Sequence, residues 1–460
     1  MAHHESEDAR IRKKVRKTSA SSHHISTSPG PSCSAHSDFV LASVQCSTSL
    51  QPLPWMDYSE MKTPMIVRIP FHRAPVGEEE ALAVCEVIRS GWLTMGPKTF
   101  EFEKEFAKYV GARDAIAVST GTAALHLSLE AAGVCAGDEV LLPTTTFTAT
   151  AEAVTYLGAR PVLVDIDPVT MNLDPEDAAR RITPRTEAII PVHLGGQPCD
   201  MDELHALAKA HHLRVIEDAA HALPSAYRGK RIGQISEFTC FSFYATKTLT
   251  TGEGGMVTTE NPSAAERIRL MRLHGIERDA WKRYRGDGSW RYEVLEAGFK
   301  YNLTDFQAAI GLVQLAKCDA MRQARQKIAE RYTNAFSPLE ELLLPEIRSD
   351  RSTSWHLYVL RLRPDRLRVD RDVFIRALEV RGVSCSVHFI PLHLQPYYQR
   401  AYGYRAGDFP NAEQQYDSCL SLPIFPGMTD QEIERVIQAV QETTVESRIV
   451  RQNAAVSPID

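Results

Sequence analysis

The sequence has few of the features that mark secreted, membrane or nucleic-acid-binding proteins. None of its nine cysteines forms a CxxC pair, so we expect buried free thiols in a reducing compartment rather than disulfides or a metal site. The absence of any run of 18 apolar residues argues against a transmembrane helix. The formal net charge of −6 argues against a protein that binds nucleic acid through a basic surface. We therefore expect a cytoplasmic protein with neither a membrane nor a nucleic-acid partner.

The first 62 residues lack the hydrophobic periodicity of a helix or a strand. They are rich in Ser and His and carry a basic run from Arg10 to Lys17. No apolar segment closely follows these charges, as a secretory signal would require. We expect residues 1–62 to form a disordered arm with a solvated basic run, and residues 447–460 to form a polar tail.

From about residue 112 the sequence alternates apolar, strand-like runs with amphipathic helical segments. Strands are expected at Ala115–Ser119, Val140–Leu142, Arg160–Asp165, Ala188–Val192, Arg214–Glu217, Phe238–Phe243 and Gly255–Thr259. Helices are expected at Thr122–Ala132, Ala149–Tyr156, Pro175–Ile182 and Met201–His211. The nearly continuous apolar character of the strands suits a sheet that is covered on both faces. The alternation therefore predicts an α/β fold with a mostly parallel, doubly wound sheet.

Beyond about residue 305 the pattern changes and predicts a second, smaller α/β domain. Helices are expected at Asp305–Phe336, Asp372–Arg381 and Asp430–Glu442, and strands at Trp355–Leu362 and Val383–Phe389. We therefore expect a large domain over residues 63–310 and a small C-terminal domain over residues 311–446.

Two groups of residues that could bind a ligand directly follow strands of the predicted sheet. Open parallel sheets bind their ligands at these carboxyl ends of the strands. Gly121 and Thr122 begin a helix, and N–H groups and a hydroxyl at a helix start can bind a phosphate. An ordinary threonine N-cap is the commoner reason for such a pattern. Asp218 follows another strand and could pair with a protonated heterocyclic nitrogen, although an acidic N-cap would look the same.

A lysine follows a third strand of the sheet. Lys247 comes a few residues after the strand Phe238–Phe243 and precedes the glycine cluster Gly252–Gly255. Alone it could be a solvated loop residue, but the glycines allow the backbone to pass close to a ligand. Pyridoxal phosphate needs a lysine for a Schiff base, a carboxylate for its pyridine nitrogen and a phosphate site. Lys247, Asp218 and Gly121–Thr122 together therefore predict this cofactor.

Six blocks of sequence resemble the DegT-type (DegT/DnrJ/StrS) sugar aminotransferases, a branch of the fold-type I pyridoxal-phosphate enzymes. They are GWLTMGPKTFEFEKEFAKYVG, STGTAALHLSL, PVHLGGQPCDMD, VIEDAAHALPSAYRGKRIG, SFYATKTLTTGEGG and GFKYNLTDFQAAIG, and the resemblance extends from about Ile69 to about Val440. The EDAAH and KYNLTD runs and the segment Gly382–Phe389 are most similar to the UDP-4-amino-4-deoxy-L-arabinose–oxoglutarate aminotransferase branch. The resemblance implies a ping-pong transfer of an amino group from glutamate to a keto-sugar nucleotide, with a UDP-4-keto-sugar expected, in a homodimer with shared active sites.

The resemblance also implies roles for single residues. Lys247 holds the cofactor and Asp218 is the partner of the pyridine nitrogen, so both are expected to be catalytic. The expected phosphate ligands are Gly121, Thr122 and Ser242.

Four further positions follow from the same resemblance. Phe147 is expected to stack on the cofactor ring, and His221 to approach the ring hydroxyl. Asn302 is expected to reach the phosphate of the neighbouring subunit. His388 is expected to lie near the sugar.

Two alternatives stay open. The substrate could be another keto-sugar or a keto-cyclitol, since the shared motifs mostly serve the cofactor. The chain could also be a non-catalytic regulatory protein that binds pyridoxal phosphate, against which Lys247, Asp218 and Ser242 argue. Thr248 and Glu253 stand where many members of the family have Asn and Asp.

Overall fold

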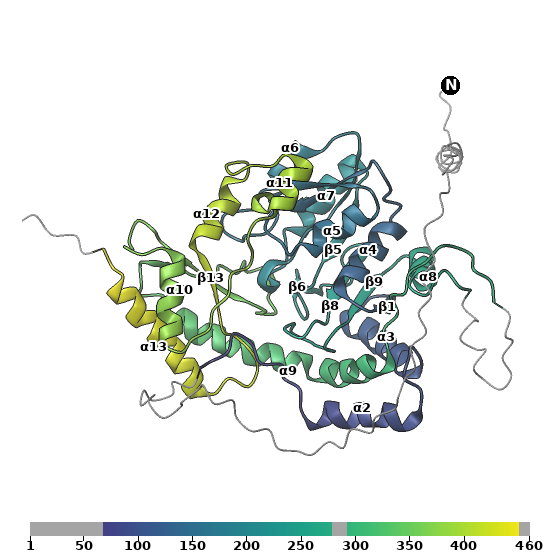
Figure 1. The fold of residues 1–460 in the computed structure, drawn as a ribbon, viewed down its shortest axis with the longest axis horizontal. Helices are drawn as coiled ribbons and strands as arrows, with labels where there is room; N and C mark the ends of the chain where they lie inside the picture. The colour runs from purple at the N-terminus through teal and green to yellow at the C-terminus, as the bar shows by residue number, and fades with distance from the viewer. Residues whose placement is uncertain (1–67, 278–291, 450–460) are drawn as a thin grey trace, which may run out of the picture. The chain divides into compact units, whose positions relative to one another are not determined.

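The computed structural model describes residues 68–277 and 292–449, and a seven-stranded sheet lies at the centre of the region after residue 112 (Figure 1). The order of its strands is β1-β9-β8-β5-β4-β2-β3. The strands are β1 (Asp114–Val118), β2 (Glu139–Pro143), β3 (Arg160–Val164), β4 (Thr186–Ile189), β5 (Arg214–Asp218), β8 (Phe238–Ser242) and β9 (Gly255–Thr259). Only β9 runs against the others, so the predicted mostly parallel α/β sheet is confirmed.

Helices cover both faces of this sheet, as Figure 1 shows. One apolar cluster joins the sheet to α4 (Gly121–Ala131), α5 (Ala149–Tyr156), α8 (Pro262–Met271), α11 (Pro396–Tyr402) and α12 (Pro410–Ser418). The other joins it to α3 (Pro97–Val110), α6 (Pro175–Arg181), α7 (Met201–His211) and the first half of α9 (Asp305–Phe336). Alternate side chains of β1 enter different clusters, Ile116 the first and Ala117 the second, because successive strand residues face opposite sides.

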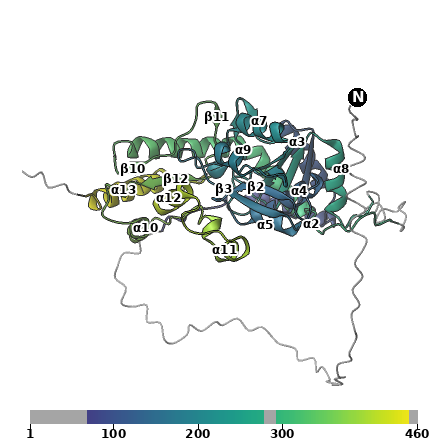
Figure 2. The ribbon, with the colours of Figure 1, turned by 90° about the horizontal axis from the view of Figure 1, so that it is seen from above.

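The C-terminal part of the chain contains a smaller antiparallel sheet in the order β10-β12-β13. Its elements are β10 (Leu342–Leu343), β12 (Tyr358–Leu362) and β13 (Cys419–Leu422), with α10 (Arg371–Val380) and α13 (Asp430–Glu446) packed nearby. Helix α9 contributes Ala308 and Leu315 to the core under the large sheet, and Tyr332 and Phe336 to the core of the small one. Figures 1 and 2 show this helix running past both sheets. The boundary between residues 310 and 311 stays a prediction.

Several expected elements have the bounds that the sequence pattern predicts. Helices α5, α7 and α9 and strand β9 begin and end at the predicted residues. The sequence pattern did not predict α2 (Glu78–Ser90), α3, α8, α11, α12 or β13. The predicted arm, residues 1–62, lies outside the described residues. The predicted tail, residues 447–460, lies outside them from residue 450 on, and Arg448 at its start forms a bridge with Leu367. No helix in the described ranges is long and apolar enough to cross a membrane.

The predicted strand over Val383–Phe389 is wrong. Its backbone bonds are divided between two partners, because Val383 forms a bridge with Ile69 while Ser386 forms one with Ser421. Neither neighbour follows the segment far enough to form a continuous ladder, so a segment whose apolar and polar residues alternate as in a strand remains irregular. This irregular segment carries His388.

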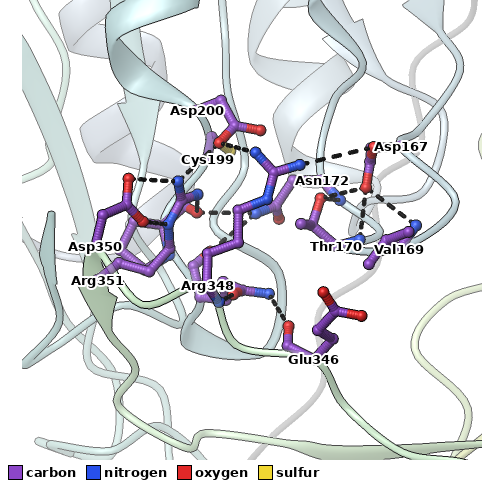
Figure 3. A network of polar contacts seen from close by, with 12 residues as sticks. Asp167, Val169, Thr170, Asn172, Cys199, Asp200, Glu346, Arg348, Asp350 and Arg351 are labelled. Carbon is purple, nitrogen blue, oxygen red and sulfur yellow. Dashed lines mark hydrogen bonds and ion pairs between the residues drawn. The ribbon is translucent and has the colours of Figure 1, made fainter.

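The segment between α9 and β12 is attached to the large-sheet region by a group of ion pairs, of which the Arg351–Asp200 pair is buried (Figure 3). Asp200, at the start of α7, accepts hydrogen bonds from Arg348 and Arg351, both at 2.7 Å. The Arg351 side chain is only 2% exposed and also pairs with Asp350. A small sheet in the order β11-β6-β7 adds backbone bonds between the same parts of the chain. Its strands are β6 (Ala226–Tyr227), β7 (Lys230–Arg231) and β11 (Arg351–Ser352).

We expect Asp200→Asn to lower the free energy of unfolding by about 2–3 kcal/mol, because the buried Arg351 guanidinium loses a charged partner. The matched control is Asp202→Asn in the same turn, where the carboxylate pairs with the exposed Arg228 and is itself 53% exposed. That change should cost less than about 1 kcal/mol. Urea unfolding followed by circular dichroism measures both losses. Equal losses of unfolding free energy in the two variants would show that the buried Arg351–Asp200 pair stabilises the fold no more than the exposed pair does.

Candidate active site

A cavity of about 460 Å³ opens at the carboxyl ends of β5 and β8, beside the start of α4. Eight of the nine site residues predicted from the sequence lie in its wall: Gly121, Thr122, Phe147, Asp218, His221, Ser242, Lys247 and His388. The residues that follow strands of the large sheet come together because these strands are parallel, so that their carboxyl ends share one edge of the sheet. His388 comes instead from the irregular segment after Val383.

Asp218, the last residue of β5, presents a buried and oriented carboxylate to this cavity. One of its oxygens accepts the hydroxyl of Thr150 at 2.8 Å, and the other accepts the backbone N–H of Ala220 at 3.1 Å. Burial raises the pKa of Asp218, and these two hydrogen bonds act in the opposite direction. Each oxygen keeps a further lone pair, so the carboxylate can still accept a bond from a group in the cavity.

Lys247 lies in the loop after β8, and its backbone N–H donates to the carbonyl of Tyr244 at 2.9 Å. Burial lowers the pKa of its ammonium group to about 8, and the charge of Asp218 opposes this shift. A lysine with such a pKa is partly neutral close to neutral pH, whereas an ordinary lysine is almost fully charged there. Its side chain can therefore act as a nucleophile or a base.

The start of α4 meets the end of β8 in very close contact. A Cβ atom on Gly121 would lie 2.8 Å from the Cβ atom of Ser242, so only glycine allows this approach. Thr120 caps the helix by accepting the N–H of Ala123 at 3.0 Å. The first N–H groups of α4 and the hydroxyls of Thr122 and Ser242 are left as donors at the cavity wall. This donor set suits a phosphate group.

The remaining predicted residues in the cavity wall have aromatic rings. Phe147 is 60% exposed, so its ring offers a face to a ligand. The Nδ1 atom of His221 accepts the backbone N–H of Gly195 at 3.3 Å, so the neutral ring carries its proton on Nε2. His388 lies 2.9 Å from the hydroxyl of Ser421 through Nδ1, and burial lowers its pKa to about 4.

Asn302, the ninth predicted residue, does not lie in the cavity wall. It pairs with Val118 at the end of β1, and its side chain accepts a hydrogen bond from Lys300. Its expected reach into a neighbouring subunit stays a prediction.

One cavity residue, His356, was not identified from the sequence. It lies in the wall together with Lys247, and its ring is next to that of His221. Its only signal in the sequence is a place at the start of a strand-like run, which does not distinguish a cavity residue from a core residue.

The residues present fit pyridoxal phosphate on three counts. A lysine of lowered pKa and a buried carboxylate share one cavity. Hydrogen-bond donors for a phosphate lie where Gly121 meets Ser242, and a side chain at position 121 would fill that space. In the described part of the chain, no group of three or more His, Cys, Asp or Glu residues is placed to hold a metal ion.

Comparisons with known proteins agree with this assignment. Residues 75–441 match the model of the DegT/DnrJ/EryC1/StrS aminotransferase family. The spore coat polysaccharide biosynthesis protein SpsC of Bacillus subtilis is 48% identical over 375 residues, which cover 81% of this chain and 96% of SpsC.

Solved structures give the same result. Spr1654 of Streptococcus pneumoniae, named as a sugar aminotransferase and solved in PMP and PLP forms, has a TM-score of 0.77 at 32% identity. In the PMP form the alignment covers 82% of this chain and 98% of Spr1654. DesV of S. venezuelae has a TM-score of 0.73 at 37% identity, over 80% of this chain and 94% of DesV.

These similarities extend over most of the chain, and they confirm the expected enzyme class and the expected cofactor, pyridoxal phosphate. The chain belongs to the DegT/DnrJ/EryC1/StrS aminotransferase family of pyridoxal-phosphate-dependent sugar aminotransferases.

Proposed function

We propose that this enzyme moves an amino group from glutamate to a keto-sugar nucleotide, a UDP-4-keto-sugar, in two half-reactions at one cavity. The observation that carries the proposal is the meeting of Lys247, Asp218 and the start of α4 in that cavity. The names of the relatives support an amino-sugar product, because SpsC serves polysaccharide biosynthesis and Spr1654 is named as a sugar aminotransferase.

Lys247 would hold the cofactor and move the proton. Pyridoxal phosphate, when bound, supplies the electron sink for the carbon that loses its proton. The lowered pKa of Lys247 leaves a share of neutral amine that can form the covalent bond to the cofactor. Once the amino donor has displaced it, the same amine would be free to accept the proton that the donor's Cα atom loses and to give it up again within the cavity.

Asp218 would face the pyridine nitrogen and keep it protonated. Thr150 and the N–H of Ala220 each hold one carboxylate oxygen, so the charge is oriented before any ligand enters. A fixed charge in a site that excludes water is effective because it needs no reorganisation during the reaction.

The other predicted residues would bind and orient. Gly121, Thr122 and Ser242 would donate to the phosphate, and the exposed ring of Phe147 would stack on the pyridine ring. His221 would donate its Nε2 proton to the ring hydroxyl. His388, held by Ser421, would contact the sugar.

We also propose a homodimer in the cytoplasm. Leu82 and Ile88 on α2 and Leu93 after it are half exposed, which suits a surface that a second copy covers. Asn302 would complete the phosphate site of that second copy. Cys85, Cys199, Cys240, Cys318, Cys385 and Cys419 are free thiols, as a reducing compartment allows.

The function is tested by the two half-reactions. We expect glutamate to remove the visible absorbance of the lysine-bound cofactor, and a UDP-4-keto-sugar to restore it. Lys247→Ala should lower turnover by about 10³-fold or more, because no other amine can replace it. Lys108→Ala, which alters a lysine that is 79% exposed, is the control. Normal transamination by Lys247→Ala would contradict the assignment.

The same assay separates the substrates. Restoration of the absorbance by a 3-keto-sugar nucleotide or a keto-cyclitol, but not by the UDP-4-keto-sugar, would correct the substrate. A bound cofactor that reacts with no amino donor would favour a regulatory protein.

A second prediction concerns the pKa of Lys247 in the cofactor-free protein. Its reductive methylation should rise with pH through a midpoint near pH 8, because burial disfavours the charged form. Asp218→Asn removes the anion that raises this pKa, so the midpoint should fall further. Mass spectrometry of the Lys247 peptide measures the rate, with the peptide of Lys108 as the exposed reference. A higher midpoint in Asp218→Asn would contradict the assigned role of that charge.

A third prediction separates the two substrates at His388. We expect His388→Asn to raise KM for the keto-sugar about tenfold, as the loss of one contact to a substrate implies. The glutamate half-reaction, which uses the cofactor side of the cavity, should change less than about twofold. Single-turnover kinetics of each half-reaction give both values. Equal losses in the two half-reactions would show that His388 supports the cofactor rather than the sugar.

A further inference from the structure

His356 has no role in the function proposed above, yet its ring contacts a residue of the cofactor site. The ring centroids of His356 and His221 are 4.3 Å apart, at an interplanar angle of 37°. The two side chains are 8% and 5% exposed and share the wall of the cavity with Lys247. The ring of Phe389 also faces His221, with centroids 6.0 Å apart and an angle of 26°. The rings of His356 and Phe389 therefore restrict rotation of the His221 side chain.

The hydrogen bonding of His221 is weak by comparison. Among the described residues, its one ring hydrogen bond is the 3.3 Å contact from the N–H of Gly195 to Nδ1, which is long for a hydrogen bond of this type. This bond favours the proton on Nε2, but at that length it holds the ring only loosely and does not fix it by itself. The contact with His356 supplies a second restraint on the same ring.

The backbone of His356 is attached to that of His221 through Ser354. The Ser354 hydroxyl donates to the His221 carbonyl at 2.5 Å and accepts the N–H of His356 at 3.3 Å. The N–H of Ser354 donates to the hydroxyl of Ser225 at 3.0 Å. Gly196 leaves room for this arrangement, since a Cβ atom there would lie 2.0 Å from the Ser354 hydroxyl. The two histidines are thus placed by one connected network.

Trp355, between Ser354 and His356, has a backbone conformation that few residues other than glycine adopt. Its φ is +51°, in the left-handed region. Such a conformation persists only where surrounding contacts enforce it. The indole N–H of Trp355 donates to Gln326 of α9 at 2.6 Å, which is one such contact. The turn at Trp355 brings His356 to the cavity.

A buried cation of α9 acts on His356. Arg325 of α9 is 1% exposed, and its Nε atom has no hydrogen-bond partner among the described residues. Burial lowers the pKa of His356 well below its usual value, and the charges of His221, Lys247 and Arg325 lower it further. Burial likewise lowers the pKa of His221. Both imidazoles are therefore neutral, so they can lie in contact without repulsion.

We propose that His356 is a positioning residue, whose ring holds the imidazole of His221 with its Nε2–H directed into the cavity beside Lys247. There the N–H donates to an oxygen of the bound cofactor, so this part of the inference rests on the proposed function. His356 acts through the face of its ring, and a flat ring without nitrogen can replace it.

The first test needs no cofactor. In protein with 15N-labelled histidine, the ring nitrogens of His221 report which of them carries the proton, and comparison with His221→Gln assigns the signals among the 16 histidines. We expect one Nε2–H form in the unaltered protein and in His356→Phe, and a mixture of forms in His356→Ala. The control is His393→Phe, which alters a buried histidine 4.7 Å from Phe409 and outside the cavity wall.

The second test is the affinity for pyridoxal phosphate. His356→Ala should weaken binding about fivefold to tenfold, as the loss of one well-placed hydrogen bond implies, and His356→Phe less than about twofold. If His356→Ala does not fold, His356→Leu, which keeps the bulk without the flat face, takes its place with the same expectation.

Two results would overturn the inference. One is a single His221 form and unchanged affinity in His356→Ala. The other is equal damage in His356→Phe and His356→Ala, because the ring face would then not be what acts. If the unaltered protein catalysed no transamination but the His221 signals were as expected, the proposed function would be wrong and the positioning role of His356 would stand.

Discussion

The buried carboxylate of Asp218 is the group on which the rest of the site depends. A charge that is only 6% exposed must be given hydrogen bonds, and here they come from Thr150 of α5 and from the N–H of Ala220. The hydrogen bond from Thr150 connects α5 to the end of β5 at the edge of the sheet. It also places an anion near Lys247, whose ammonium group burial has already made less basic. The charge of each group opposes the pKa shift that burial causes in the other. The cavity beside them is suited to a ligand with a protonated nitrogen, which Asp218 can bind, and an electrophilic carbon, which Lys247 can attack.

The site is assembled from two regions with different architecture. The parallel sheet provides the lysine, the carboxylate and the phosphate donors at the ends of its strands. The C-terminal part provides His356 and His388, neither of which lies on a strand that enters the cavity. His388 reaches it because the segment from Val383 divides its backbone bonds between two partners and stays irregular. The segment before His356 is fixed by the buried pair of Arg351 and Asp200.

The success of sequence reasoning differed between elements for identifiable reasons. Helices α5, α7 and α9 were found with their bounds, whereas α2 and α3 were missed although their apolar residues also recur with a helical period. The alternating segment Val383–Phe389 was misread, because strand propensity cannot show whether a neighbour offers a continuous ladder. Lys247, Asp218 and Gly121–Thr122 were found because chemistry at the ends of parallel strands is visible as a functional residue after an apolar run. Phe147, His221, Ser242 and His388 were found only through the family resemblance.

The sequence by itself determined the parallel sheet, the family, and the set formed by Lys247, Asp218 and Gly121, since each follows a strand and has a residue type that its chemistry demands. Only the tertiary structure decided how close Gly121 comes to Ser242, how basic Lys247 is, and which ring lies against His221. Burial and contact between distant segments control these properties. Neither leaves a period or a spacing in the chain, so the pair of His221 and His356 could be recognised only once the two segments were seen together.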